Sequence, residues 1–147
     1  MFREADAVWT DGPYRGKGSI SVASGALSNT DYVYGAVDIG NRTTPGELLA
    51  AAIASSVSAT VALNMTMLGA RPASVSTHAT ITLVEMADTW RIASVHLDVA
   101  VQASDTDAGR LQEAIEETQA HCPIASDLNL DVSYKTKWIP LGTTKVA

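Results

Sequence analysis

The residues most able to do chemistry in this chain are one cysteine and three histidines. Cys122 is the single cysteine among 147 residues, and its thiol could attack an electrophile or be oxidised. His78, His96 and His121 could act as bases or metal ligands, but none stands four residues from another histidine or from the cysteine on one helix. One cysteine also excludes an internal disulfide and a cysteine-rich metal site. We therefore expect no metal and no bound cofactor.

The position of Cys122 leaves two interpretations open. It ends a helical pattern directly before Pro123, where a cysteine often serves as a small buried hydrophobe. The alternative is a redox thiol. The C-terminus of a helix is expected to raise the pKa of a thiol, which disfavours a primary nucleophile. His121 points about 100° away from Cys122 around a helix, so it is not an obvious base for the thiol.

Two further motifs have simpler structural interpretations. The segment Gly12–Gly18 is similar to a phosphate-binding loop, but its spacing is one residue short, and Gly18 stands where that loop needs Ser or Thr. We expect a turn between two strands there. Thr44-Pro45-Gly46-Glu47 has the pattern of a capping box, so Glu47 is expected to cap a helix rather than to act as an acid or base.

The hydrophobic pattern predicts the strand and helix order β-β-β-α-β-β-α-β. After three short N-terminal strands, the last at 32–34, a long helix covers 44–68 and stops at Gly69. Strands at 73–85 and 90–101 form a hairpin with a bulge near Ala93. A second helix covers 105–122, with Asp105 and Asp107 at its start, and a last strand covers 130–138. The residues expected on one face of the long helix are Leu49, Ile53, Ser56, Thr60, Leu63 and Met67.

Composition limits the class of protein. Lys and Arg number 10 against 16 Asp and Glu, and the net charge of −6 disfavours binding to nucleic acid or anionic membranes. Residues 48–70 are uncharged and long enough to span a membrane, but their Ser, Thr and Asn content favours a buried helix of a soluble protein. We expect one α+β domain over residues 1–147, located in the cytoplasm.

Three segments together resemble the OsmC/Ohr family of organic-hydroperoxide reductases. They are 15–18 (Arg-Gly-Lys-Gly) followed by Ser24-Gly25, the helix start at 44–52, and 121–124 (His-Cys-Pro-Ile). The resemblance covers nearly the whole chain. It implies an OsmC-like fold, with antiparallel sheets wrapped around two central helices in an intertwined homodimer. It also implies active sites at the subunit interface.

The resemblance further implies a two-cysteine peroxidase, from which this chain departs. In the family a helix cysteine attacks the peroxide, a cysteine before a proline resolves it, and an arginine and a glutamate assist. The matching positions here are Ser56 for the attacker, Cys122 for the resolver and Gly46 for the glutamate. For the arginine, Arg15 lies roughly where Ohr members place theirs, and Arg42 is a loose neighbour of the place that OsmC members use. A serine hydroxyl cannot form a sulfenic acid, so peroxidase activity is expected to be lost or weak.

Three consequences of this departure stay open at the level of sequence. Cys122 alone could carry a one-cysteine peroxidase reaction, with an external thiol resolving it. The dimer could instead be a non-enzymatic protein that holds a small hydrophobic ligand or a hydroperoxide. Ser56 itself is expected to donate a hydrogen bond back to the carbonyl of Ala52, as helix serines do.

Overall fold

The computed structural model describes residues 1–12, 16–35, 38–103 and 108–141. Its elements follow the predicted order. They are β1 (Ala5–Thr10), β2 (Lys17–Val22), β3 (Thr30–Tyr32), α2 (Pro45–Met67), β4 (Pro72–Met86), β5 (Thr89–Ala103), α3 (Ala108–His121) and β6 (Val132–Pro140). The chain divides into two compact units, Met1–Leu49 and Ala50–Ala147, which are described separately below. The single domain expected over residues 1–147 stays a prediction.

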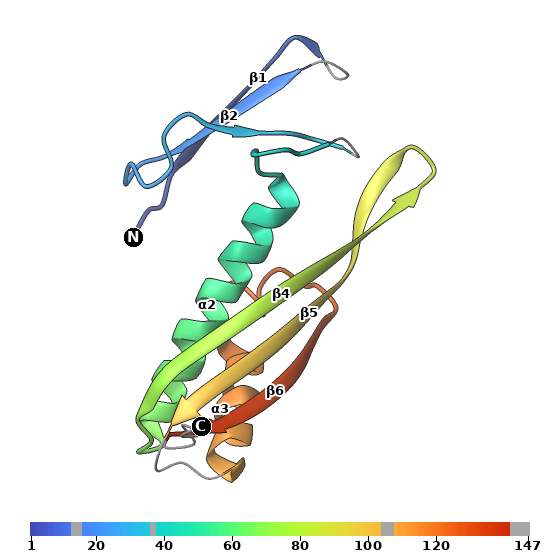
Figure 1. The fold of residues 1–147 in the computed structure, drawn as a ribbon. Helices are drawn as coiled ribbons and strands as arrows, with labels where there is room; N and C mark the ends of the chain where they lie inside the picture. The colour runs from blue at the N-terminus through green and yellow to red at the C-terminus, as the bar shows by residue number, and fades with distance from the viewer. Residues whose placement is uncertain (13–15, 36–37, 104–107, 142–147) are drawn as a thin grey trace, which may run out of the picture. The chain divides into compact units, whose positions relative to one another are not determined.

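The first unit holds a three-stranded antiparallel sheet in the order β1-β2-β3 (Figure 1). Its third strand ends at Tyr32, earlier than predicted, because the chain then turns to meet the segment before α2. There the amide of Val33 donates to the carbonyl of Thr43 at 2.9 Å. The amide of Thr43 donates in turn to the carbonyl of Asp31 at 3.2 Å. These bonds fix where the chain arrives at the start of α2.

The capping box predicted for α2 is confirmed in both directions. The Glu47 amide donates to the Thr44 hydroxyl at 3.1 Å, and the Thr44 amide donates to the Glu47 carboxylate at 3.0 Å. The helix ends at Met67, and Gly69 caps it, because its φ of 81° lets the amide of Ala70 reach back to the carbonyl of Met65 at 2.9 Å. Both ends of the long helix therefore follow from local sequence.

The second unit packs α2 and α3 against one face of the sheet β4-β5-β6 (Figure 1). The β4–β5 hairpin is antiparallel, and its register skips Ala93 between Thr82 and Leu83, which confirms the predicted bulge. β6 pairs with β5 in parallel, so the expectation of purely antiparallel sheets is wrong for this pair. A parallel pair needs a crossover connection, and α3 supplies it.

The core of this unit lies between the sheet and the helices. Alternate residues of β5 are buried as predicted, and they are Val95, Leu97, Val99 and Val101. The buried residues of α2 recur every four positions and are Ile53, Val57, Val61 and Met65. Of the residues predicted to share one face of α2, Ile53 is buried, whereas Leu63 and Met67 are 58% and 77% exposed. The helix is apolar on several sides, so periodicity did not select its buried side.

Candidate functional site

The structure brings Ser56 and Cys122 into direct contact. Ser56 lies in the middle of α2, and Cys122 follows the last residue of α3. Their side chains share a hydrogen bond, with the Ser56 Oγ 3.2 Å from the Cys122 Sγ. The two positions are 66 residues apart in sequence, so only the packing of α2 against α3 joins them. A second bond between these helices, from Asn64 Nδ2 to Thr118 Oγ1 at 3.0 Å, holds that packing.

The backbone of Cys122 belongs both to the end of α3 and to the start of the next helical turn. Its amide donates to the carbonyl of Thr118 at 2.9 Å, which completes α3. Its own carbonyl accepts from the amide of Ser126 at 2.9 Å, which starts a new helical turn. Pro123 then stands at the first position of that turn, where proline is favoured. Cys122 is therefore the N-cap of the following turn as well as the end of α3.

This geometry lowers the pKa of the Cys122 thiol. Burial raises the pKa, but four hydrogen bonds to the sulfur together lower it by more than burial raises it. The donors are the Ser56 hydroxyl, the Ala125 amide, the Thr60 hydroxyl and the Ile124 amide. The expectation that a helix C-terminus raises this pKa is wrong. The sulfur faces the amides that open the next turn, and amides at such a position stabilise an anion.

Two further side chains stand near the sulfur. The Thr60 Oγ1 lies 3.8 Å from the Cys122 Sγ and donates to the carbonyl of Ser56 at 2.9 Å. Tyr134 is half-buried on β6, where it pairs with the buried Leu97. Burial and the nearby Cys122 thiolate both raise the pKa of the Tyr134 phenol. The sulfur is thus surrounded by hydroxyl and amide groups from α2, the turn after α3, and β6.

The predicted bond from Ser56 to the Ala52 carbonyl is not the one that forms. Ser55 donates to that carbonyl at 3.0 Å, whereas the hydroxyl of Ser56 points to Cys122. Ser55 therefore makes the bond within the helix, and the Ser56 hydroxyl makes its hydrogen bond with the Cys122 sulfur. Cys122 itself is fully buried in this chain.

The other predicted positions fall outside this cluster. Arg15 lies outside the described residues, as do Asp105 and Asp107. Glu47 caps α2 as expected, and Gly46 lies in the first turn of that helix.

The histidines also lie apart from the sulfur. His78 is exposed and His96 is half-exposed. His121 pairs with Glu117 at 2.9 Å, so it is not the base for Cys122. Within the four described ranges, no group of three His, Cys, Asp or Glu side chains is placed to hold a metal ion.

Sequence reasoning missed the groups that set the chemistry of Cys122. The sequence pattern places Thr60 on one face of the long helix and Tyr134 within the last strand, and it assigns neither to the thiol. The amides of Ile124 and Ala125 have no signature in their side chains. The Cys-Pro step was the available signal, because proline favours the first position of a helical turn and so makes the residue before it an N-cap.

The chain is similar to proteins of the OsmC-like family. The family model for OsmC-like proteins matches residues 39–137 of this chain. A curated relative, "Peroxiredoxin OsmC" of Escherichia coli, is 28% identical over 134 residues, which cover 90% of this chain and 94% of the relative. These matches give no clear indication of a membrane protein. By length and hydropathy alone, Pro45–Met67 could cross a membrane, a test that core helices of soluble proteins also pass.

Solved structures give the same fold. An OsmC-like protein from Mycoplasma pneumoniae matches with a TM-score of 0.77 at 11% identity, covering 95% of this chain and 98% of that one. The organic hydroperoxide resistance protein OhrB of Bacillus subtilis matches with a TM-score of 0.66 at 17% identity, covering 92% and 98%. At such identities the likeness concerns the fold, and it confirms the OsmC-like architecture expected from the sequence.

Proposed function

Because the chain belongs to the OsmC-like protein family, we propose that it is a hydroperoxide-reactive stress protein that has lost the two-cysteine cycle. In this proposal the remaining thiol chemistry rests on Cys122. The observation that carries it is the 3.2 Å contact between the Ser56 Oγ and the Cys122 Sγ. The resemblance pairs an attacking cysteine in the first helix with a resolving cysteine before proline. Such a pair must be adjacent to form a disulfide, and Ser56 occupies the adjacent place.

The proposed reaction uses one sulfur. The Cys122 thiolate attacks the outer oxygen of a hydroperoxide ROOH, an S–O bond forms and the O–O bond breaks. The products are the Cys122 sulfenic acid and the alcohol ROH, after the alkoxide takes up a proton. An external thiol then forms a mixed disulfide with release of water, and a second external thiol restores Cys122 and leaves as a disulfide. The hydroxyl of Ser56 cannot replace the external thiol, because oxygen does not form the disulfide.

Two properties of the site act on the rate in opposite directions. The lowered pKa of Cys122 increases the thiolate fraction, which favours attack. The sulfur has no solvent-accessible surface in this chain, so a peroxide must wait for a local opening. We therefore expect stoichiometric oxidation to be detectable and catalytic turnover to be slow.

Mass spectrometry after one equivalent of cumene hydroperoxide tests the proposal. With dimedone present to trap a sulfenic acid, we expect one adduct that maps to Cys122. The Cys122→Ser variant should carry none, because it has no thiol. Thr60→Val serves as a partial control, since it keeps the Ser56 and Cys122 side chains and removes the 3.8 Å contact to the sulfur together with the bond to the Ser56 carbonyl. A wild-type chain that stays unmodified while fully folded would contradict the one-cysteine reaction and favour the non-enzymatic alternative.

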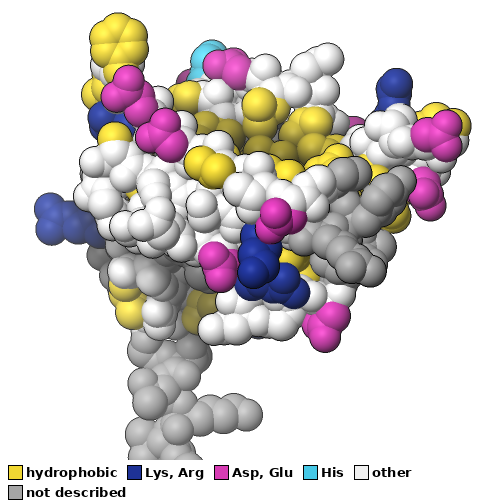
Figure 2. All heavy atoms as spheres, turned by 90° about the horizontal axis from the view of Figure 1, so that it is seen from above, with side chains coloured by type: hydrophobic (Ala, Val, Ile, Leu, Met, Phe, Trp, Pro, Cys, Tyr) yellow, Lys and Arg dark blue, Asp and Glu magenta, His cyan; other side chains and the backbone are white. Residues whose placement is uncertain are grey.

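We also propose that the chain forms a homodimer in the cytoplasm. The support is apolar surface that a single chain leaves open to solvent, as on the face in Figure 2. Within the second unit, exposed hydrophobic side chains gather on α2 and at the tip of the β4–β5 hairpin. They are Leu63, Met67, Leu83, Val84, Met86 and Trp90. β6 pairs with β5 only from Val95 onward, so this tip is a two-stranded ribbon without a third strand.

Light scattering coupled to size-exclusion chromatography tests the dimer. The wild type should elute with twice the mass of one chain, and the double variant Leu63→Glu with Met67→Glu should shift toward one chain. Leu128→Glu changes an exposed leucine outside these segments and should leave the mass unchanged. A monomeric wild type at micromolar concentration would refute the homodimer. Cell fractionation, with the protein found in membranes or outside the cell, would refute the location.

A further inference from the structure

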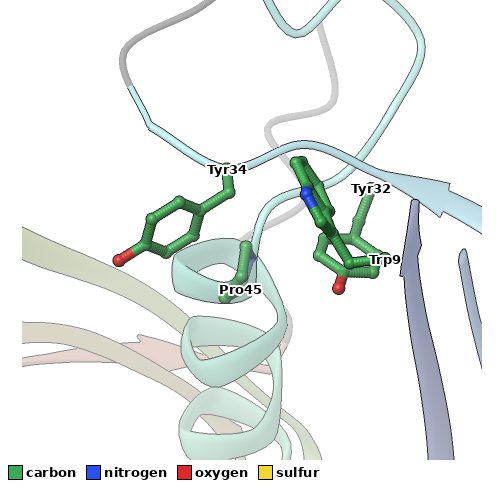
Figure 3. A pocket seen from close by; sticks show the side chains of 4 residues that line it. All are labelled: Trp9, Tyr32, Tyr34 and Pro45. Carbon is green, nitrogen blue, oxygen red and sulfur yellow. The ribbon is translucent and has the colours of Figure 1, made fainter. Parts of the chain in front are cut away.

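An aromatic pocket lies in the first unit and involves none of the residues around Cys122. It is lined by Trp9, Tyr32, Tyr34 and Pro45 and has a volume of about 330 Å³. Figure 3 shows Tyr34 on one side and Trp9 with Tyr32 on the other, with Pro45 at the start of α2 between them. That volume is within the lower range of small-molecule sites.

Gly16, just before β2, and Gly18, within β2, leave the space that the rings of Trp9 and Tyr32 fill. Gly18 pairs with Trp9 on one side and with Tyr32 on the other, so both rings lie over it on the same face of the sheet. A Cβ at Gly18 would overlap the ring of Tyr32, and a Cβ at Gly16 would overlap the indole of Trp9. The segment that was similar to a phosphate loop thus serves to seat two aromatic rings.

The rings have a fixed arrangement. The centroids of Trp9 and Tyr32 lie 5.6 Å apart with an interplanar angle of 46°. The indole nitrogen of Trp9 donates to the carbonyl of Gly12 at 2.9 Å, which satisfies its single polar group. Trp9 therefore offers the pocket a ring rather than a hydrogen-bond donor. A site with these rings binds through their π faces.

Charge selects among the ligands that such a site could take. None of the four lining residues carries a charge, so an anion finds no partner among them. The carboxylate of Glu47, two positions after Pro45, is committed to the cap of α2, and the whole chain has a net charge of −6. Arg42, close to Pro45 in sequence, is committed to the carbonyls of Ile39 and Asp38. The faces of aromatic rings are negative and attract cations, tryptophan most strongly.

We propose that this pocket binds a small organic cation of the quaternary ammonium type. The methyl groups would contact the rings of Trp9, Tyr32 and Tyr34, and the rest of the ligand would extend to solvent. The net negative charge of the whole chain favours a cation over an anion at this site. This site is independent of the thiol chemistry proposed for Cys122, and either can be wrong without the other.

Titration with choline and with its neutral isostere 3,3-dimethyl-1-butanol tests the proposal. The two ligands have nearly the same shape and differ in the positive charge. We expect choline to shift the indole NMR signal of Trp9 with a Kd at or below about 1 mM, and the isostere to bind about tenfold more weakly. The indole signals of Trp90 and Trp138, which do not line the pocket, should stay in place.

Two variants separate ring contacts from general apolar contact. Tyr34→Leu keeps the apolar bulk and removes one π face, and it should weaken choline binding severalfold without unfolding the chain, because Tyr34 is 65% exposed and lies outside the strands. Trp90→Leu is the matched control on an exposed aromatic residue of the second unit and should change nothing. Equal binding of the neutral isostere, or no shift of Trp9 with choline, would overturn the proposal. So would a Tyr34→Leu variant that binds choline as the wild type does.

Discussion

Restoring sulfur at position 56 should rebuild a disulfide in this fold. In the Ser56→Cys variant the new sulfur would stand where the hydroxyl now lies, 3.2 Å from the Cys122 Sγ. A disulfide has a bond length near 2.05 Å, so the two atoms must approach by about 1 Å. A small rotation of the side chains supplies such a shift. We therefore expect the variant to close a disulfide after one equivalent of an organic hydroperoxide.

The size of the effect follows from the loop that the bond would close. Positions 56 and 122 are separated by 66 residues. The chain-entropy relation gives about 4 kcal/mol of stabilisation for a loop of that length, before any strain is subtracted. For a protein of this size, one kcal/mol corresponds to about 3 °C in Tm, so the oxidised variant should melt about 10 °C above its reduced form.

The same variant supplies its own control. Calorimetry of Ser56→Cys with and without a reductant compares two redox states of one sequence at one protein concentration, which keeps any dimerisation equilibrium comparable. Intact mass should fall by two hydrogens on oxidation. Turnover of cumene hydroperoxide with a dithiol reductant should rise above that of the wild type, and adding Gly46→Glu should raise it further.

One result would refute the reasoning about Ser56. If Ser56→Cys folds, consumes the hydroperoxide and ends with one sulfenic acid and one free thiol instead of a disulfide, the side chains at 56 and 122 are not neighbours in solution. The assignment of Ser56 to the place of the attacking cysteine would then fail. A closed disulfide without gain in turnover would instead keep the geometry and place the defect in activation of the thiol.

Further predictions concern the same helices. Ser56→Ala should raise the pKa of Cys122 and slow its alkylation at neutral pH by about three- to tenfold, and an unchanged rate would deny the hydrogen bond its role. Because folding lowers the Cys122 pKa, stability relative to Cys122→Ser should rise at alkaline pH and fall again as the pH drops through the folded pKa, which urea unfolding at several pH values measures. Thr118→Val removes the buried partner of Asn64 and should cost about 1–3 kcal/mol in urea, whereas a second change, Asn64→Leu, should recover part of it. Thr44→Ala removes the helix cap and should cost about 1 kcal/mol in the same assay, and no loss would contradict the cap.

Much of the fold follows from local sequence signals. The capping box at Thr44, the stop at Gly69 and the alternation along β5 each have one physical solution, and the structure has all three. The buried side of α2 did not follow in the same way. Leu63 and Met67 are as apolar as the residues that are buried, so only the tertiary packing could decide between them.

The candidate site divides along the same line. The family resemblance selected Ser56 and Cys122, and the structure places them in contact. The protonation behaviour of Cys122 was predicted in the wrong direction, because the sequence shows a helix ending there and does not show that another turn begins on the same residue. The backbone amides of Ile124 and Ala125 lower the pKa of Cys122, and the side chains at these positions do not indicate that contact.

Pro123 decides what happens to an oxidised Cys122. A sulfenic acid can protect itself by closing a ring onto the backbone nitrogen of the next residue, which gives a sulfenamide. That closure needs a nitrogen with a hydrogen, and proline has none. Pro123 therefore prevents an oxidised Cys122 from being protected as a sulfenamide. Without an outside thiol, excess peroxide would carry it irreversibly to the sulfinic acid.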